Sequence, residues 1–336
     1  MTGAETYTNK SPIRNALRPL EIPTYEGSGQ VVHPDILFFN DGWQGWGYWM
    51  AFTPYPFEKG KYENPSVAVS QDGLSWQVPD GLENPLDSAS HYVNCDPDLR
   101  NNPSTKELFL YYIDRGPRES YLKLTASKEG IVWSKPMVVF ETPNFFVSPA
   151  IVIKKNKDGK DFFYMWAVRT SGWASSNSAL EFMESADGYV WSEPETLSVN
   201  LPQKVIWHLD VAYIEYYQEF WALLCCYDSL SVYDFPKKVW VETNSAPDKI
   251  VPTGLYLARS KNGRSWQACS KPILMPTRDG WDSERIYRST FLYDSLDNRI
   301  RIWYSAANRN KEWHVGYTEC DFNKLAGYLG WMIDSL

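Results

Sequence analysis

Short apolar runs recur along the chain, and polar or glycine-containing turns separate them. Examples are the stretches ILFF at 36–39, LFLYYI at 108–113 and AIVI at 150–153. Runs of this kind, rich in β-branched and aromatic residues, are too short for most helices and are typical of buried strands. Helical periodicity is weak throughout the chain, so the hydrophobic pattern predicts an all-β protein.

One short phrase occurs four times between such strands. Its frame is Ser, any residue, then Asp, Glu or Asn, then Gly, any two residues and Trp. A polar residue followed by glycine is a turn signal between antiparallel strands. Each copy follows an apolar strand, so each is predicted to be a hairpin that joins two strands. The copies are SQDGLSW at 70–76, SKEGIVW at 127–133, SADGYVW at 185–191 and SKNGRSW at 260–266.

Two further strands precede each copy of the phrase, and a fifth pair of strands follows the last copy without it. Repeated units of about four strands are the signature of a β-propeller. We therefore expect a single domain over 1–336, a five-bladed β-propeller with antiparallel blades around a central channel. The fifth unit is one strand short, and the N-terminal segment 1–30 is expected to supply the strand that closes it.

The opening strands of the five units align with one another. Because the first strand of each blade lines the channel, each aligned position should form a ring of side chains around the axis. The first position holds His33, Asp96, Ser148, His208 and Arg288. The third position holds Asp35, Asp98, Ala150, Asp210 and Thr290. Polar residues from all five blades are thus predicted to converge on one cavity near the channel mouth.

These rings are a candidate active site. Carboxylates held close together repel one another and are costly to bury unless cations compensate them, a role open to His33, His208 and Arg288. Such carboxylates acquire separated pKa values, which lets an acid and a base coexist at neutral pH. The alternative is that the rings only provide a polar lining for a water-filled channel.

The same residues leave open a divalent cation in the channel. Oxygen ligands favour Ca²⁺ or Mg²⁺, and calcium is the cofactor considered first. The two histidines, His33 and His208, would shift the preference toward a transition metal. The sequence alone assigns no residue as a metal ligand.

The amino-acid composition limits the classes of molecule that the protein is expected to bind and the places where it is expected to occur. The formal net charge of −8 disfavours a nucleic-acid binder, and the aromatic content of 16% suits the recognition of sugar rings. An odd count of five cysteines suggests reduced thiols. The N-terminus has no apolar segment typical of a secretory signal, and no apolar run is long enough to insert into a membrane. A cytoplasmic or virion-associated protein is therefore expected.

The hairpin phrase and the DPD motif at 96–98 resemble the five-bladed propeller glycosidases over roughly residues 30–320. These are glycoside hydrolase families 43, 32 and 68, together with the mannoside phosphorylases of family 130. The overall pattern is most similar to uncharacterised bacterial and phage proteins of this kind. The resemblance implies a base in blade one, a pKa-tuning Asp in blade two and a general-acid Glu in blade three.

The catalytic roles of the resembling glycosidases can be assigned only in part to residues of this sequence. It implies Asp35 as the base and Asp98 or Asp210 as the tuning or acid residue, with Asp96 as a further catalytic carboxylate. Blade three reads Val147-Ser148-Pro149, so the expected Glu is absent. Glu63 and Glu284 are candidate substitutes. The predicted substrate-binding residues are His33, His208, Arg288, Tyr287, Trp207, Glu63 and Trp46.

We therefore predict a carbohydrate-active protein, in the first place a glycoside hydrolase acting on an oligo- or polysaccharide through carboxylates at the channel mouth. The missing blade-three Glu favours an alternative, a non-catalytic carbohydrate-binding propeller associated with a phage or a surface. A glycoside phosphorylase is a third reading, in which Arg285 and Arg288 would bind phosphate.

Overall fold

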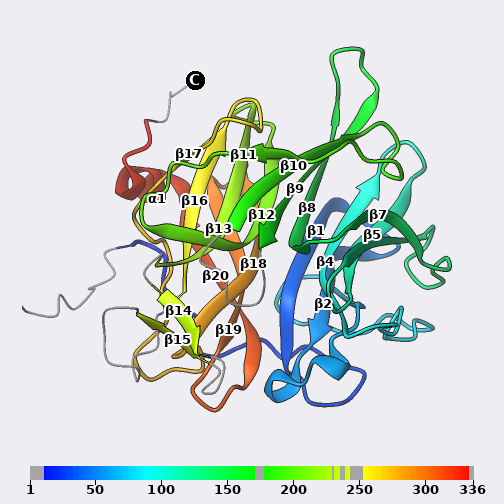
Figure 1. The fold of residues 1–336 in the computed structure, drawn as a ribbon, viewed down its shortest axis with the longest axis horizontal. Helices are drawn as coiled ribbons and strands as arrows, with labels where there is room; N and C mark the ends of the chain where they lie inside the picture. Colours follow the sequence, from blue (N-terminus) through cyan, green and yellow to red (C-terminus); the bar gives the residue numbers. More distant parts are fainter. Residues whose placement is uncertain (1–10, 171–177, 229–230, 235–238, 243–252, 333–336) are drawn as a thin grey trace, which may run out of the picture.

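The computed structural model describes residues 11–170, 178–228, 231–234, 239–242 and 253–332. Five antiparallel sheets stand around a common axis (Figure 1). Blade one contains β1 (Val31–Trp43), β2 (Trp46–Pro54) and β3 (Ser66–Ser70). Blade two contains β4 (Val93–Asn102), β5 (Glu107–Arg115), β6 (Ser120–Ser127) and β7 (Met137–Thr142). Blade three contains β8 (Phe145–Lys155), β9 (Asp161–Thr170), β10 (Ser178–Ser185) and β11 (Glu195–Leu197).

The remaining two blades complete the ring. Blade four contains β12 (Lys204–Ile214), β13 (Glu219–Asp228), β16 (Gly254–Ser260) and β17 (Gln267–Ala268). Blade five contains β18 (Arg285–Asp294), β19 (Arg299–Ala307) and β20 (Trp313–Asp321). The additional hairpin of β14 (Ser231–Asp234) and β15 (Val239–Glu242) is inserted between β13 and β16. Short 3-10 turns η1 (Pro56–Glu58) and η2 (Gly60–Tyr62) follow β2, and helix α1 (Phe322–Leu329) follows β20.

The first strand of every blade lies on the inside of the ring. Strand β1 contacts β4, β4 contacts β8, β8 contacts β12, β12 contacts β18, and β18 returns to β1. This closure brings the five aligned positions together around one axis. The predicted all-β, five-bladed propeller is therefore confirmed.

The repeated phrase forms the predicted turn by the same hydrogen bonds in blades one, three and four, whereas in blade two Glu129 accepts only the Val132 amide. In blade one, Ser70 Oγ accepts from the Gly73 amide, and Asp72 Oδ1 accepts from the amides of Leu74 and Ser75 at 2.8 and 2.7 Å. In blade four, Asn262 Oδ1 accepts the equivalent two amides at 2.9 and 2.8 Å. The polar residue before glycine therefore satisfies backbone donors that the tight turn leaves unpaired.

Glycine is required in this turn because the neighbouring blade packs directly against it. Gly130 has a φ of 78°, and a Cβ there would lie 2.2 Å from the Trp49 ring of blade one. In the other three copies, the carbonyl oxygen of the turn glycine accepts a hydrogen bond from an aromatic side chain of the preceding blade. The pairs are Trp303 to Gly73, Tyr111 to Gly188 and Trp166 to Gly263. The phrase thus joins adjacent blades as well as adjacent strands.

Replacing Asp72 with alanine should destabilise the protein by about 1 kcal/mol, because two turn amides lose their acceptor. Asp72→Asn should retain most of the stability, since Asn262 makes the same bonds in blade four. Desolvation alone would raise the pKa of Asp72, but hydrogen bonds from Ser75 and Leu74 lower it to about 2. If the wild type has a larger free energy of unfolding than Asp72→Asn, the difference should therefore be present above pH 4 and disappear toward pH 2. Denaturant unfolding across this range tests both statements; equal stability of wild type and Asp72→Ala would contradict them.

Both ends of the described chain pack beside blade five. The Leu20 amide donates to the carbonyl of Val315 in β20, and Thr318 Oγ1 donates to the Arg14 carbonyl. Residues 11–30 form no strand, so closure of the blade by this segment stays a prediction. Helix α1 was not predicted; the Asp321 side chain caps it, and Gly330 ends it in the left-handed conformation.

None of the helices in the described ranges has the length and apolar character needed to cross a bilayer.

Candidate functional site

Each inner strand is irregular where it enters the channel. The β-ladder shifts register beside His33, Asp96 and Ser148, and also at the matching points of β12 and β18. The three named residues have φ values of 54°, 52° and 54°, and each precedes a proline. Proline cannot donate to the ladder, so X-Pro sequences suit such bulges. The bulges re-aim the first-position side chains, and left-handed residues of this kind cluster at functional sites.

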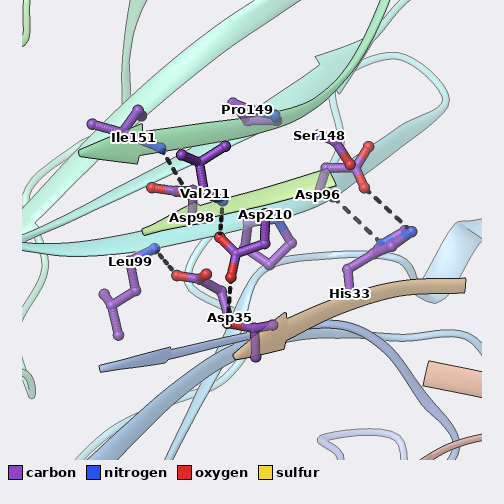
Figure 2. Close-up of polar contacts among 12 residues, drawn as sticks. His33, Asp35, Asp96, Asp98, Leu99, Ser148, Pro149, Ile151, Asp210 and Val211 are labelled. Carbon is purple, nitrogen blue, oxygen red and sulfur yellow. Dashed lines mark hydrogen bonds and ion pairs between the residues drawn. The ribbon is translucent and has the colours of Figure 1, made fainter. Parts of the chain in front are cut away.

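Three first-position residues form a compact, buried cluster. Ligand atoms of His33, Asp96 and His208 all lie within 4.8 Å of one another. His33 Nε2 lies 3.3 Å from Asp96 Oδ1, and His208 Nδ1 lies 3.4 Å from the same oxygen. Figure 2 shows His33 and Asp96 facing each other beside Ser148. We call these three residues the histidine cluster.

The two histidine rings are held by their Nδ1 atoms. His33 Nδ1 is 3.0 Å from Thr53 Oγ1, and His208 Nδ1 is 2.7 Å from Ser148 Oγ. Within the described residues, the Nε2 atoms of both rings are buried and have no hydrogen-bond partner. Buried polar atoms nearly always have a partner, so an unpaired Nε2 on each of two rings that both approach the Asp96 carboxylate indicates a missing ligand.

The protonation states of the histidine cluster match those of metal ligands. Burial lowers the pKa of His33 to about 4 and that of His208 well below its ordinary value, although Asp96 opposes the shift. Burial would raise the pKa of Asp96, but His33, His208 and Arg288 outweigh it and lower that pKa. Two neutral imidazoles and one ionised carboxylate are the forms that bind a metal ion.

Glu63 stands beside the histidine cluster. It follows η2, is 6% exposed, and places Oε1 3.4 Å from His33 Nδ1. Burial and the charge of Asp96 raise its pKa to about 8. The Tyr287 ring lies 4.2 Å from the His208 ring and 5.3 Å from the His33 ring, between centroids.

The third-position residues form a separate group, the acidic cluster of Asp35, Asp98 and Asp210. The Arg100 guanidinium lies among them, 3.0 Å from Asp35, 2.7 Å from Asp98 and 3.6 Å from Asp210. Arg288 approaches Asp98 to 3.9 Å while it donates to backbone carbonyls of blades two and three. Three buried carboxylates thus face two cations.

Each carboxylate of the acidic cluster also accepts a backbone amide from another blade. Asp35 accepts the Leu99 amide at 2.6 Å, and Asp98 accepts the Ile151 amide at 3.2 Å. Asp210 accepts the Phe291 amide at 3.3 Å. These bonds link blade one to two, two to three, and four to five, which gives the acidic cluster a role in joining blades.

The predicted site residues are therefore brought together in two neighbouring clusters of different chemistry. Glu63 and Tyr287 lie at the histidine cluster, and Trp207 packs edge-on against the His208 ring at 5.5 Å. Trp46 lies apart, because it pairs with Trp43 at the far end of the β1–β2 hairpin from His33. Sequence reasoning missed Arg100, although its place in the DPDLR motif, two residues after Asp98, was a usable signal.

Comparisons with known proteins agree with this architecture. No family model matches the chain. A curated relative from Flavonifractor plautii, an A type blood N-acetyl-alpha-D-galactosamine deacetylase, is 28% identical over 96% of this chain. The match covers 49% of that protein, so the chain spans about half the length of its relative.

Solved structures show the same fold. An N-acetylgalactosamine deacetylase from F. plautii, in complex with blood group B trisaccharide, superposes with a TM-score of 0.79 at 25% identity. The match covers 95% of this chain and 98% of that one. An alpha-L-arabinofuranosidase from Podospora anserina matches with a TM-score of 0.62 at 12% identity, over 92% of this chain and 96% of its own. A thermostable family-43 glycoside hydrolase matches with a TM-score of 0.57 at 13% identity, over 86% and 88%. The chain therefore shares the five-bladed propeller fold with these proteins, as its hairpin and DPD motifs predict.

Proposed function

We propose that this protein is a metal-dependent hydrolase that removes the acetyl group from an N-acetylated amino sugar in a glycan. The observation that carries the proposal is the histidine cluster, in which both Nε2 atoms are buried without a hydrogen-bond partner and both rings lie within 3.4 Å of the Asp96 carboxylate. The relationship to a protein named as an N-acetylgalactosamine deacetylase supports this substrate class. Because the chain spans half of that relative, both the activity and the sugar are part of the proposal.

The donor set fits a divalent transition metal. His33 would provide Nε2, His208 would provide an imidazole nitrogen, and Asp96 would provide a carboxylate oxygen. Two imidazoles and one carboxylate form a typical catalytic set that leaves coordination positions open for water and substrate. A metal ion bound there would polarise the acetamide carbonyl and lower the pKa of a bound water. The calcium predicted from oxygen ligands is less suited to this nitrogen-rich set.

The chain's own residues have separate parts in this reaction. Thr53 and Ser148 orient the two imidazoles through their Nδ1 atoms, which fixes the direction of each Nε2. Glu63, the buried acid nearest the histidine cluster, would act in its ionised form, which the positive charge of a bound metal ion favours: it would accept the proton of the attacking water and pass it to the leaving nitrogen. The C–N bond of the acetamide breaks, and acetate and the free amine are the products.

The direct test measures acetate release from N-acetylgalactosamine- and N-acetylglucosamine-terminated glycans. We expect acetate and a free amino sugar with the glycosidic bond intact, loss of activity after chelation, and recovery when Zn²⁺ or Mn²⁺ is returned. Phosphate should have no effect. Chelator-insensitive cleavage of the glycosidic bond would contradict the proposal, as would binding of the glycans without any turnover.

A glycoside hydrolase is the second candidate function, and one observation at the acidic cluster favours it. Burial raises the pKa of Asp35 to about 6, against the opposing charge of Arg100. A carboxyl group with such a pKa could exchange protons near neutrality. In this reading Asp35 is the base, and Asp98, Asp210 or Asp96 supplies the acid or tunes it.

Asp35→Asn separates the two functions. If the histidine cluster carries the chemistry, we expect turnover within about tenfold of wild type and a lower midpoint of denaturation, because the contact with Arg100 is weakened. If Asp35 is a glycosidase base, roughly 10²–10⁴-fold of turnover should be lost while the fold survives. Acetate release and glycosidic cleavage measured on the same preparations decide between them. Asp282→Asn, a change at another buried carboxylate outside both clusters, is the matched control.

A further inference from the structure

We infer that a second sugar-binding subsite lies beside the histidine cluster, in a cavity of about 460 Å³ walled by Tyr25, Tyr62 and Tyr92. It would hold the neutral hexose units that follow the terminal N-acetylated sugar of a glycan. This inference rests on the proposed function for the orientation of the substrate. The volume falls in the range of small-molecule binding sites.

The cavity is built on the segments that carry the candidate site. Tyr62 directly precedes Glu63, which contacts His33. Tyr92 directly precedes β4, four positions before Asp96. An extended chain rises by about 3.3 Å per residue, so Tyr92 lies about 13 Å or less from Asp96 along the backbone. The cavity therefore lies within the length of a trisaccharide from the histidine cluster.

The walls of the cavity suit a sugar ring. Tyr92 is 62% exposed and Tyr25 is 36% exposed, which is unusual for two large aromatic rings that border one cavity. Flat aromatic faces accept the C–H face of a hexose, and tyrosine hydroxyls hydrogen-bond to sugar hydroxyls. Asn64, Ser88, His91 and Lys61 add polar groups to the lining, the Lys61 ammonium lies over the Tyr62 ring at 4.6 Å, and no Asp or Glu lines the cavity. A neutral sugar therefore meets no buried charge there.

The tyrosines are held in place before any ligand arrives. The Tyr25 hydroxyl donates to the Tyr62 carbonyl at 2.9 Å and accepts from Asn64 Nδ2 at 3.2 Å. Asn64 Oδ1 also accepts the Ala89 amide at 2.8 Å, so the loop before Tyr92 is held by the same asparagine that contacts Tyr25. Preorganised walls lose little conformational entropy on binding, which favours recognition over incidental exposure.

Asp114 anchors the same loop from beneath. This buried carboxylate accepts from Ser90 Oγ at 2.5 Å and lies 3.1 Å from His91 Nδ1. The His91 ring stacks on Tyr121, with centroids 5.4 Å apart. Three loops, around Tyr25, Tyr62 and Tyr92, are thus fixed relative to one another by polar contacts.

Calorimetry with the full chain in a Glu63→Gln background, which slows turnover, tests the subsite. The probes are an N-acetylgalactosamine-terminated trisaccharide and methyl N-acetylgalactosaminide. We expect the trisaccharide to bind more tightly than the monosaccharide. Tyr92→Ala should raise the Kd of the trisaccharide by about tenfold, the size of one aromatic contact, and leave the monosaccharide Kd unchanged.

Tyr216→Ala is the matched control, because Tyr216 is 50% exposed but lies in the β12–β13 turn, away from the histidine cluster. The inference is overturned if the trisaccharide binds no more tightly than the monosaccharide, or if Tyr92→Ala changes both Kd values alike. It is also overturned if neither sugar binds. A trisaccharide preference that Tyr92→Ala removes, with no acetate release by the wild type, would support the subsite and reject the proposed function alone. Thermal denaturation of each variant checks that the fold is intact.

Discussion

Asp96→Asn should abolish both the binding of a divalent metal and the release of acetate. Asp96 is 1% exposed and lies within 3.4 Å of both imidazoles, so it is the only charged ligand in the proposed donor set. Loss of an outer-sphere partner typically costs about 10–100-fold in metal affinity or activity, and loss of a direct ligand should exceed that range. We therefore expect less than about 1% of wild-type turnover.

Elemental analysis of the purified protein provides the first measurement, and acetate release provides the second. Wild type is expected to contain about one metal ion per chain after growth with added Zn²⁺ or Mn²⁺. Asp282→Asn should retain that metal, since Asp282 is buried in hydrogen bonds to Thr277 and Tyr304 rather than to the histidine cluster. Stoichiometric metal in Asp96→Asn, or none in the wild type, would show that the histidine cluster is not a metal centre.

Glu63→Gln should lower turnover by roughly 10²–10⁴-fold, the usual contribution of general acid–base catalysis. Glutamine has nearly the same shape but cannot take up the proton of the attacking water. The three metal ligands are untouched, so metal content and KM should stay close to those of the wild type. This combination distinguishes a proton-transfer residue from one that only holds His33 in position.

Glu181→Gln serves as the control for this change, because Glu181 is a buried acid paired with Arg169 at 2.6 Å. Single-turnover kinetics and elemental analysis should be performed on the same samples. If Glu63→Gln loses its metal, then Glu63 supports the ligands instead of transferring a proton. If it retains full turnover, the proton acceptor lies elsewhere, and Asp35 becomes the first residue to test.

Several features of the candidate site could not be predicted from the sequence. The repeat correctly aligned His33, Asp96 and His208, yet it placed them in one group with Asp35, Asp98 and Asp210. The separation arises because the ladder is bulged beside the first position, while the third-position carboxylates accept amides of adjacent blades. Amide partners such as Leu99, 64 positions from Asp35, exist only after the ring closes.

Two further residues became meaningful only in three dimensions. Arg100 compensates the acidic cluster from within, and no repeat marks it, since the other blades have no arginine at that position. Glu63 belongs to a loop that occurs once in the chain. The sequence could name it as a candidate acid, but its approach to His33 depends on how the η2 segment folds over the channel.

The sequence by itself determined the fold class, the number of blades, the hairpin positions and the residues that face the channel. These follow from short-range patterns, because strand alternation and turn chemistry repeat with every blade. The tertiary structure decided which of those residues share a cluster, which ones bond to another blade, and which keep an unpartnered atom. Such properties depend on contacts between residues far apart in the chain, and they are established only when the five inner strands close into a ring.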